Sequence, residues 1–252
     1  MRLSVKSVHA IGVALFVAVC RVHAQGGPPM ITDDPGTPGN NHWEINMAWT
    51  DQRTPGSTLV GAPLLDANYG VGETLQINYQ SSWNILRDSG AGSESGYGDS
   101  QLALKWRFHD ADGLQASMYP RFTFVNPGSD ADRRGVTDSR PSFLMPFEVL
   151  KDLGVISVNA DFGYQYSAER VLRGWTGGLC LGREVLKGWE LDAEVHASSS
   201  DSLDRTEAIF NVGSHIDVTK NATLLLAIGC DMHNSLAPKV SLLTYVGIQV
   251  RL

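Results

Sequence analysis

The stretch HWEINMAWT, residues 42–50, alternates strictly between two kinds of side chain. Apolar side chains occupy every second position, namely Trp43, Ile45, Met47 and Trp49. Because successive side chains of a β-strand point to opposite faces, this period predicts a strand with one apolar and one polar face. The period alone does not say whether the apolar face meets a protein core or lipid, and the rest of the chain must decide that.

The same alternation recurs up to the last residue, where 246–252 still alternate. About twelve such segments can be recognised, and long polar connections alternate with short turns between them. In an up-and-down meander, all the long connections then fall on one side and all the short ones on the other. The long connections are predicted near 51–60, 84–98, 126–140, 167–173, 198–204 and 231–238, and the short ones near 71–73, 109–113, 150–154, 186–188 and 217–221.

Three features favour lipid over a protein core. The alternating runs are about nine to eleven residues long, the length of a tilted membrane-crossing strand, whereas strands of soluble proteins average about five or six. Aromatic residues gather near the ends of the runs, and charged residues lie within the polar faces. Strands can cross lipid only as a closed cylinder. Residues 42–252 are therefore predicted to form an all-β, transmembrane, antiparallel up-and-down β-barrel of about twelve strands; a soluble β-sandwich is the alternative.

The first 24 residues have the pattern of a secretory signal peptide. Arg2 and Lys6 precede a short apolar run at 8–20, and small residues follow before Gln25. The sequence thus predicts cleavage before Gln25, a periplasmic N-terminal segment at 25–41, and insertion of the barrel into the outer membrane of a Gram-negative cell. The whole chain carries 20 basic and 27 acidic residues, a net charge of −7, which argues against nucleic acid as a partner.

A closed barrel would turn its polar faces towards the lumen. Twelve strands lie between the filled cylinder of about eight and the open pore of about sixteen, so the lumen would be narrow and partly blocked by side chains or by residues 25–41. The leading hypothesis is a passive channel for small molecules, and the alternatives are a paired charge network and a non-conducting barrel that displays loops. The predicted lumen-lining residues are Glu44, Asp66, Lys105, Arg107, Arg121, Glu148, Asp161, Glu190, Asp192, Glu194, His196 and Arg251.

His196 and Ser198 suggest a second class of function. This pair resembles the His-x-Ser arrangement of outer-membrane lipid hydrolases, in which a histidine base activates a serine nucleophile, and Asn211 or Glu207 could orient the base. Those enzymes act from the outer face of the barrel, whereas the period turns His196 inward. We therefore expect no catalytic site.

Adjacent carboxylates at Asp33 and Asp34 raise the question of calcium. Further regularly spaced oxygen ligands are lacking nearby, so a capping or docking turn is favoured, and no metal or cofactor is expected. Cys180 and Cys230 are 50 residues apart without a metal-binding spacing, which favours two free cysteines over a disulfide.

Four stretches resemble a known family: ITDDPGTPGNNHWEIN (31–46), LDANYGVGETLQINY (65–79), GDSQLALKWRF (98–108) and LGREV (181–185). They are similar to the outer-membrane transporters called the MetA-pathway-of-phenol-degradation family, over nearly the whole chain after residue 24. The resemblance implies an outer-membrane barrel that transports small compounds, aromatic ones among them. It implies no catalytic residues, and the bilayer and small solutes would be the partners of the protein.

Overall fold

The computed structural model describes residues 27–126, 129–131, 133–137, 140–167 and 173–252, and the predicted signal peptide lies outside these ranges. The described chain is all-β, as predicted. The strands are β1 (Trp43–Thr54), β2 (Ser57–Val71), β3 (Leu75–Asp88), β4 (Gly92–Ala111), β5 (Leu114–Met118), β6 (Arg121–Phe124), β7 (Ser142–Asp152), β8 (Ser157–Ser167), β9 (Gly174–Leu186), β10 (Trp189–Ser200), β11 (Thr206–Asp217), β12 (Ala222–Asn234) and β13 (Leu242–Arg251).

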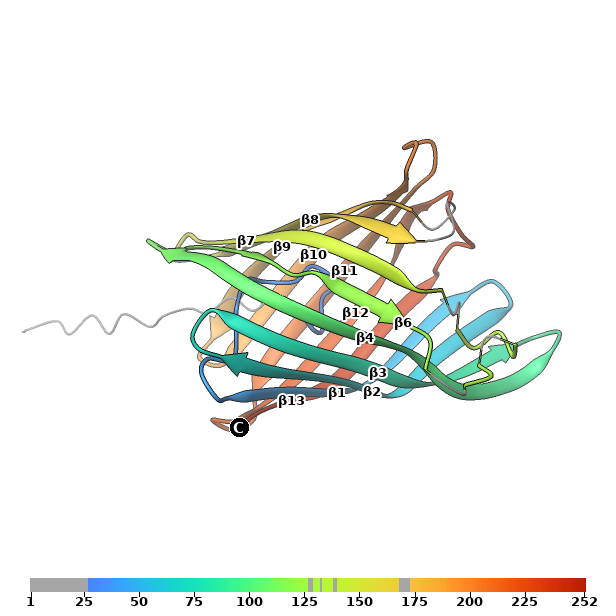
Figure 1. The fold of residues 1–252 in the computed structure, drawn as a ribbon, viewed down its shortest axis with the longest axis horizontal. Coiled ribbons are helices and arrows are strands. Elements are labelled where there is room, and N and C mark those ends of the chain that lie inside the picture. The colour runs from blue at the N-terminus through green and yellow to red at the C-terminus, as the bar shows by residue number, and fades with distance from the viewer. Residues whose placement is uncertain (1–26, 127–128, 132, 138–139, 168–172) are drawn as a thin grey trace, which may run out of the picture.

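The strands form a closed antiparallel barrel (Figure 1). Strands pair with their neighbours in the sequence, and β1 pairs with β13, so that Glu44 lies opposite Arg251. At this seam Trp43 and Leu252 exchange two backbone hydrogen bonds of 2.9 Å. Because the described strands close into a ring without a free edge, the backbone N–H and C=O groups of each strand can form hydrogen bonds within the sheet. The predicted up-and-down barrel is confirmed.

Two prolines explain why the barrel has 13 strand segments but twelve staves. β5 and β6 both pair with β4 on one side and with β7 on the other. Together they therefore form one stave, that is, one strand position in the barrel wall. The break falls at Tyr119 and Pro120, and Pro146 of β7 lies beside it, accepting a hydrogen bond from the Tyr119 amide. Proline lacks an amide proton, so both prolines are placed where the ladder is interrupted.

The burial pattern is the reverse of a soluble protein's. Of the opening stretch, Trp43, Met47 and Trp49 are 40–47% exposed, while Asn46 between them is 1% exposed. The apolar faces of the other strands are exposed in the same way, and asparagine, glutamine and charged side chains are buried within. The apolar face therefore forms the outer surface of the barrel. The alternative of a soluble sandwich, which would bury that face against a second sheet, is wrong.

The polar connections predicted near 51–60 and 84–98 are largely strand. β1 and β2 continue until a turn at Gly56, and β3 and β4 until residues 89–91, so both hairpins reach beyond the rest of the barrel at one end (Figure 1). Backbone pairing needs no hydrophobic alternation, and a hairpin surrounded by solvent can be polar on both faces. Composition therefore predicted loops where the ladder continues. The short turns gather at the opposite end (Figure 1).

Candidate functional site

Residues 27–41, here called the inner segment, run through the lumen of the barrel and leave it at one end, where Asn40 and Asn41 are exposed. Side chains from β4, β6, β8, β10 and β11 contact it from around the wall. Met30 and Thr32 are buried, and the segment leaves along β2, where the Asn41 amide donates to the Gly70 carbonyl at 3.0 Å. Because the inward faces of the strands are polar, they offer this segment hydrogen bonds and charges in place of an apolar core.

The first attachment of the inner segment is to Glu194 of β10. The carboxylate accepts hydrogen bonds from the backbone amides of Ile31 at 2.9 Å and Thr32 at 2.8 Å. Asn211 of β11 donates a further hydrogen bond to it at 2.6 Å. Glu194 is 1% exposed, and charge-assisted hydrogen bonds of this kind are stronger than neutral ones. Residues 31–32 are thereby tied to one wall of the lumen.

The second attachment is an ionic cluster around Asp33. Asp33 binds Lys105 of β4 at 3.0 Å and Arg121 of β6 at 2.8 Å. Both cations also face Glu148 of β7, at 3.5 and 3.2 Å, and Ser117 donates a hydrogen bond to Glu148 at 2.6 Å. Glu148 is fully buried. Two carboxylates thus balance two cations, one carboxylate from the wall and one from the inner segment.

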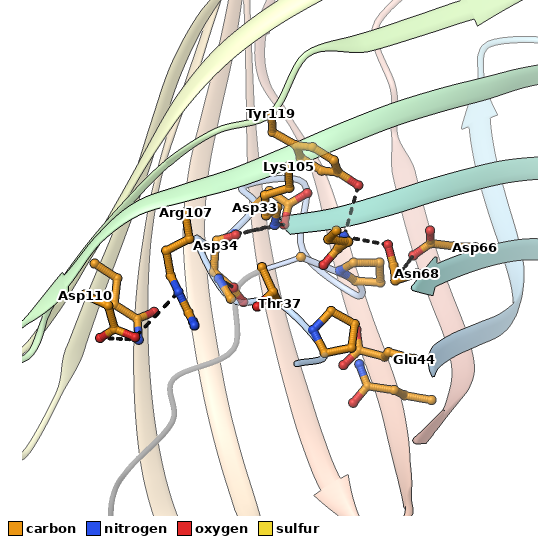
Figure 2. Close-up of a pocket in the computed structure, with 17 residues that line it drawn as sticks. Asp33, Asp34, Thr37, Glu44, Asp66, Asn68, Lys105, Arg107, Asp110 and Tyr119 are labelled. Atoms are coloured by element: carbon orange, nitrogen blue, oxygen red, sulfur yellow. Dashed lines mark hydrogen bonds and ion pairs between the residues drawn. The ribbon is translucent and has the colours of Figure 1, made fainter. Parts of the chain in front are cut away.

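The ring of Tyr119 faces these two cations. Its ring centroid is 4.5 Å from Lys105 Nζ and 4.3 Å from Arg121 Cζ, within the range of cation–π attraction. Figure 2 shows Tyr119 and Lys105 together with Asp33 and Asp34, and the Asp34 carbonyl accepts a hydrogen bond from Lys105. The break between β5 and β6 places Tyr119 here, so the irregular stave contributes directly to the cluster.

The third attachment is to His215 of β11. Its Nδ1 lies 3.0 Å from Asp192 Oδ2, and its Nε2 lies 3.2 Å from the Pro28 carbonyl oxygen. Both neighbours are hydrogen-bond acceptors, so both ring nitrogens are placed as donors. The three attachments come from different parts of the wall and hold the inner segment across the lumen.

Two of the cavities that border the inner segment lie towards opposite ends of the barrel. The short-turn cavity, about 380 Å³, is lined by Asp110 and Gln115 on either side of a short turn, and it carries more acidic than basic side chains (Figure 2). The long-loop cavity, about 480 Å³, is lined by Arg173, Arg205 and Leu236 from the opposite end and by Ile31 of the inner segment. Ionisable residues of the short-turn cavity are Asp33, Asp34, Glu44, Asp66, Asp110, Lys105 and Arg107; those of the long-loop cavity are Arg121, Arg173, Arg205, Asp161, Glu207 and His196.

The twelve predicted lumen-lining residues fall into three groups. Four border the short-turn cavity, three border the long-loop cavity, and the others are buried or paired within the barrel. Their role in transport stays a prediction. The residues at the short-turn cavity are Glu44, Asp66, Lys105 and Arg107, and those at the long-loop cavity are Arg121, Asp161 and His196. The remaining five are Glu148, Glu190, Asp192, Glu194 and Arg251. Arg251 lies 3.7 Å from Glu44.

Three residues of the site were missed as lumen residues by sequence reasoning. Asp33 was considered only as part of a docking or metal-binding turn, and it docks. Tyr119 lies on the polar face of its run, and His215 lies in step with Asn211 along β11, so the two-residue period could have found both. Nothing in the sequence indicates which wall residues the Asp33 carboxylate meets.

His196 and Ser198 do not form the arrangement of a hydrolase. Thr176 lies between them, with its hydroxyl 3.2 Å from His196 Nε2 and 3.5 Å from Ser198 Oγ. The two suggested orienting residues have other partners, since Asn211 donates to Glu194 and Glu207 accepts from Asn234. The pair borders the long-loop cavity, as its period predicts. Within the described chain Cys180 is buried, Cys230 is exposed, and both are free.

Gly178 of β9 has no side chain, and this lets Thr32 of the inner segment lie against the strand. A Cβ at this position would overlap Thr32 Oγ1. We expect Gly178→Ala to loosen residues 31–33, measured as faster proteinase K cleavage within residues 27–41. Gly182→Ala on the same strand is the control, because its Cβ would meet Glu190, Ser157 and Asp192. Equal cleavage of both variants would contradict a specific fit at Gly178.

Comparisons with known proteins agree with this architecture. No protein-family model and no curated protein matches the chain. The COG4313 outer membrane channel from Pseudomonas putida F1 has a TM-score of 0.70 at 14% identity, covering 90% of this chain and 100% of that one. The NanC porin has a TM-score of 0.59 and the KdgM porin 0.55, each at 10% identity. They cover 82% and 81% of this chain, and 100% and 98% of their own. The chain thus has the β-barrel fold found in outer-membrane channels and porins.

Proposed function

We propose that this protein is a passive outer-membrane channel for small solutes. The observation that carries the proposal is the reversed burial pattern: an apolar surface surrounds a closed barrel whose interior holds charged side chains and cavities. Charges inside a barrel are typical of a wet lumen, and the apolar band suits hydrocarbon. After removal of residues 1–24 the chain would insert with its long hairpins outside the cell.

In this proposal the short-turn end faces the periplasm, as the short turns of outer-membrane barrels do. Residues 27–41 then enter the lumen from the periplasmic side, and the inner segment separates the two cavities. The structure would represent a state of low conductance, in which lumen charges are engaged by the segment. Movement of solutes requires the segment to shift or solutes to pass beside it.

Small aromatic molecules are the proposed solutes, on the resemblance to the phenol-degradation transporters. A non-conducting barrel is the competing function, and the buried ionic cluster around Asp33 favours it, because a paired network across the lumen also stiffens a barrel. The two functions share a fold and differ in whether ions pass.

Single-channel recording in a planar lipid bilayer distinguishes them. We expect the purified protein to produce unitary conductance steps that are smaller than those of a wide, sixteen-stranded porin. Folding is checked separately by the shift in gel mobility between unheated and heated samples. A folded protein that gives no steps over a wide voltage range would overturn the channel proposal and favour the non-conducting barrel.

The conductance should depend on pH through Asp33. Burial raises the pKa of a carboxyl, but Lys105 and Arg121 outweigh burial here, so the pKa of Asp33 lies below its ordinary value. The stabilisation of the docked segment is therefore complete above the ordinary pKa of about 3.9 and is lost as the pH falls through the lowered value. We expect low conductance from pH 7 to 5 and an increase below pH 4.

Asp33→Asn is the control for this pH dependence. Its conductance should already be raised at pH 7, and the increase below pH 4 should be absent. Asp34 differs because burial raises its pKa, so it takes up a proton at higher pH than Asp33. If the conductance of Asp33→Asn rose by the same amount below pH 4, the titrating group would be a residue other than Asp33.

A further inference from the structure

We infer that the long-loop cavity binds a small organic anion, a carboxylate carried on an apolar or aromatic body. This inference deepens the proposed channel function, since it names the solute that the channel would select. It rests on the composition of the cavity walls: three arginines, hydroxyl groups and an apolar surface converge on about 480 Å³. Small-molecule sites of about 300–1,000 Å³ commonly combine an apolar lining with a few polar groups.

The three arginines come from separate parts of the barrel. Arg121 belongs to β6, Arg173 immediately precedes β9, and Arg205 immediately precedes β11. Each guanidinium carries five N–H donors in a planar fork that matches a carboxylate. Their convergence on one cavity indicates recognition of an anion from several directions.

Arg173 has donors that its hydrogen bonds among the described residues do not use. Arg121 binds Asp33 and Glu148 through Nη2, and its Nε, which has no partner among the described residues, is too buried to reach a ligand. Arg173 donates from Nε to the Ser167 carbonyl at 2.6 Å and from Nη2 to the Tyr166 hydroxyl at 3.4 Å. These bonds position the guanidinium through one edge and leave further N–H groups for a ligand.

The acidic residues of this cavity have partners of their own. Asp161 accepts a weak hydrogen bond from the Asp33 amide at 3.5 Å, and Glu207 accepts one from Asn234 at 2.8 Å. Three arginines and two carboxylates line this cavity, and one of the arginines, Arg121, is also paired with Asp33 and Glu148. The short-turn cavity has five carboxylates against two cations, so an anion is favoured at the long-loop end alone.

The apolar part of the wall separates an organic anion from an inorganic one. Ile31, Leu144 and Leu236 border the same cavity as the arginines. A bare ion such as chloride would gain nothing from this surface, whereas a ring or short chain would bury apolar area against it. Thr176 and Ser198 add hydroxyl groups to the lining. The site therefore suits a molecule with one charged end and one apolar end.

Benzoate is a suitable probe because it has this form. Isothermal titration of the detergent-purified protein should show benzoate binding, with benzyl alcohol and chloride at least tenfold weaker. Arg205→Gln and Arg173→Gln should each weaken benzoate binding at least tenfold, because each removes a charge-assisted hydrogen bond to the carboxylate. Arg87→Gln, at an exposed position of β3, is the matched control and should bind as the unmodified protein does.

The outcomes separate this inference from the channel proposal. Equal binding of benzoate and benzyl alcohol would overturn the anion site, as would unchanged binding in the double variant Arg173→Gln/Arg205→Gln. Either result leaves the conductance measurement untouched. Arginine-dependent benzoate binding by a protein that gives no conductance steps would support the site and overturn the channel.

Discussion

Removal of residues 27–35 from the chain that follows the signal peptide is expected to raise the single-channel conductance several-fold. These residues cross the lumen and are held by Glu194, by His215 and by the cations around Asp33. Once they are removed, the two cavities join, and water can solvate the wall charges. The barrel itself should persist, because its backbone ladder closes without the segment through β1 and β13.

Recording in planar bilayers measures this change, with the gel-mobility shift on heating as the test of folding. Asp33→Asn provides a graded comparison, since it removes one attachment and should give a smaller or intermittent increase. Unchanged conductance in a folded deletion variant would show that ions pass elsewhere, and the inner segment would then be a structural filling.

Glu148→Gln is expected to lower the free energy of unfolding by about 3 kcal/mol, because it removes one partner of a buried ionic cluster. Glu148 is fully buried and faces both Lys105 and Arg121. The amide keeps the size of the side chain, so the loss would come from charge. Asp33 would remain as the one carboxylate bound to both cations.

Urea unfolding of the protein in lipid vesicles, followed by tryptophan fluorescence, measures this loss. Glu44→Gln is the matched control, because Glu44 faces Arg251 at a longer 3.7 Å and both side chains are partly exposed. Exposed pairs contribute about 0–1 kcal/mol. Equal losses in the two variants would contradict the claim that burial makes the Glu148 cluster stabilising.

The architecture could be predicted from local pattern to a large extent. Alternation at 42–50 and in later runs predicted the strands, and aromatic and charge placement predicted that the apolar face is outermost. The split of the stave at Tyr119 and Pro120 was not predicted, because the run from 114 to 124 keeps its period across the break. The prediction of a loop at 84–98 was wrong for the opposite reason, because the backbone ladder between β3 and β4 persists there without hydrophobic alternation.

The lumen was predicted only in part. The two-residue period assigns Glu194 and Lys105 to the polar face of their strands, which requires knowledge of one strand at a time. Their partners Ile31 and Asp33 are distant in the sequence by 163 and 72 residues. Pairing across such distances depends on barrel closure and strand register, and neither is encoded in a local pattern.

By itself, the sequence determined that this chain forms alternating strands with an apolar and a charged face, because side-chain direction in a strand follows from backbone geometry at each residue. The tertiary structure decided that the inner segment, one of the two fillings that the sequence allowed, enters the lumen, that Asp33 completes a charge cluster of the wall, and that carboxylates are concentrated at the short-turn end. These features arise where side chains from several strands converge, and that convergence exists only in the closed barrel.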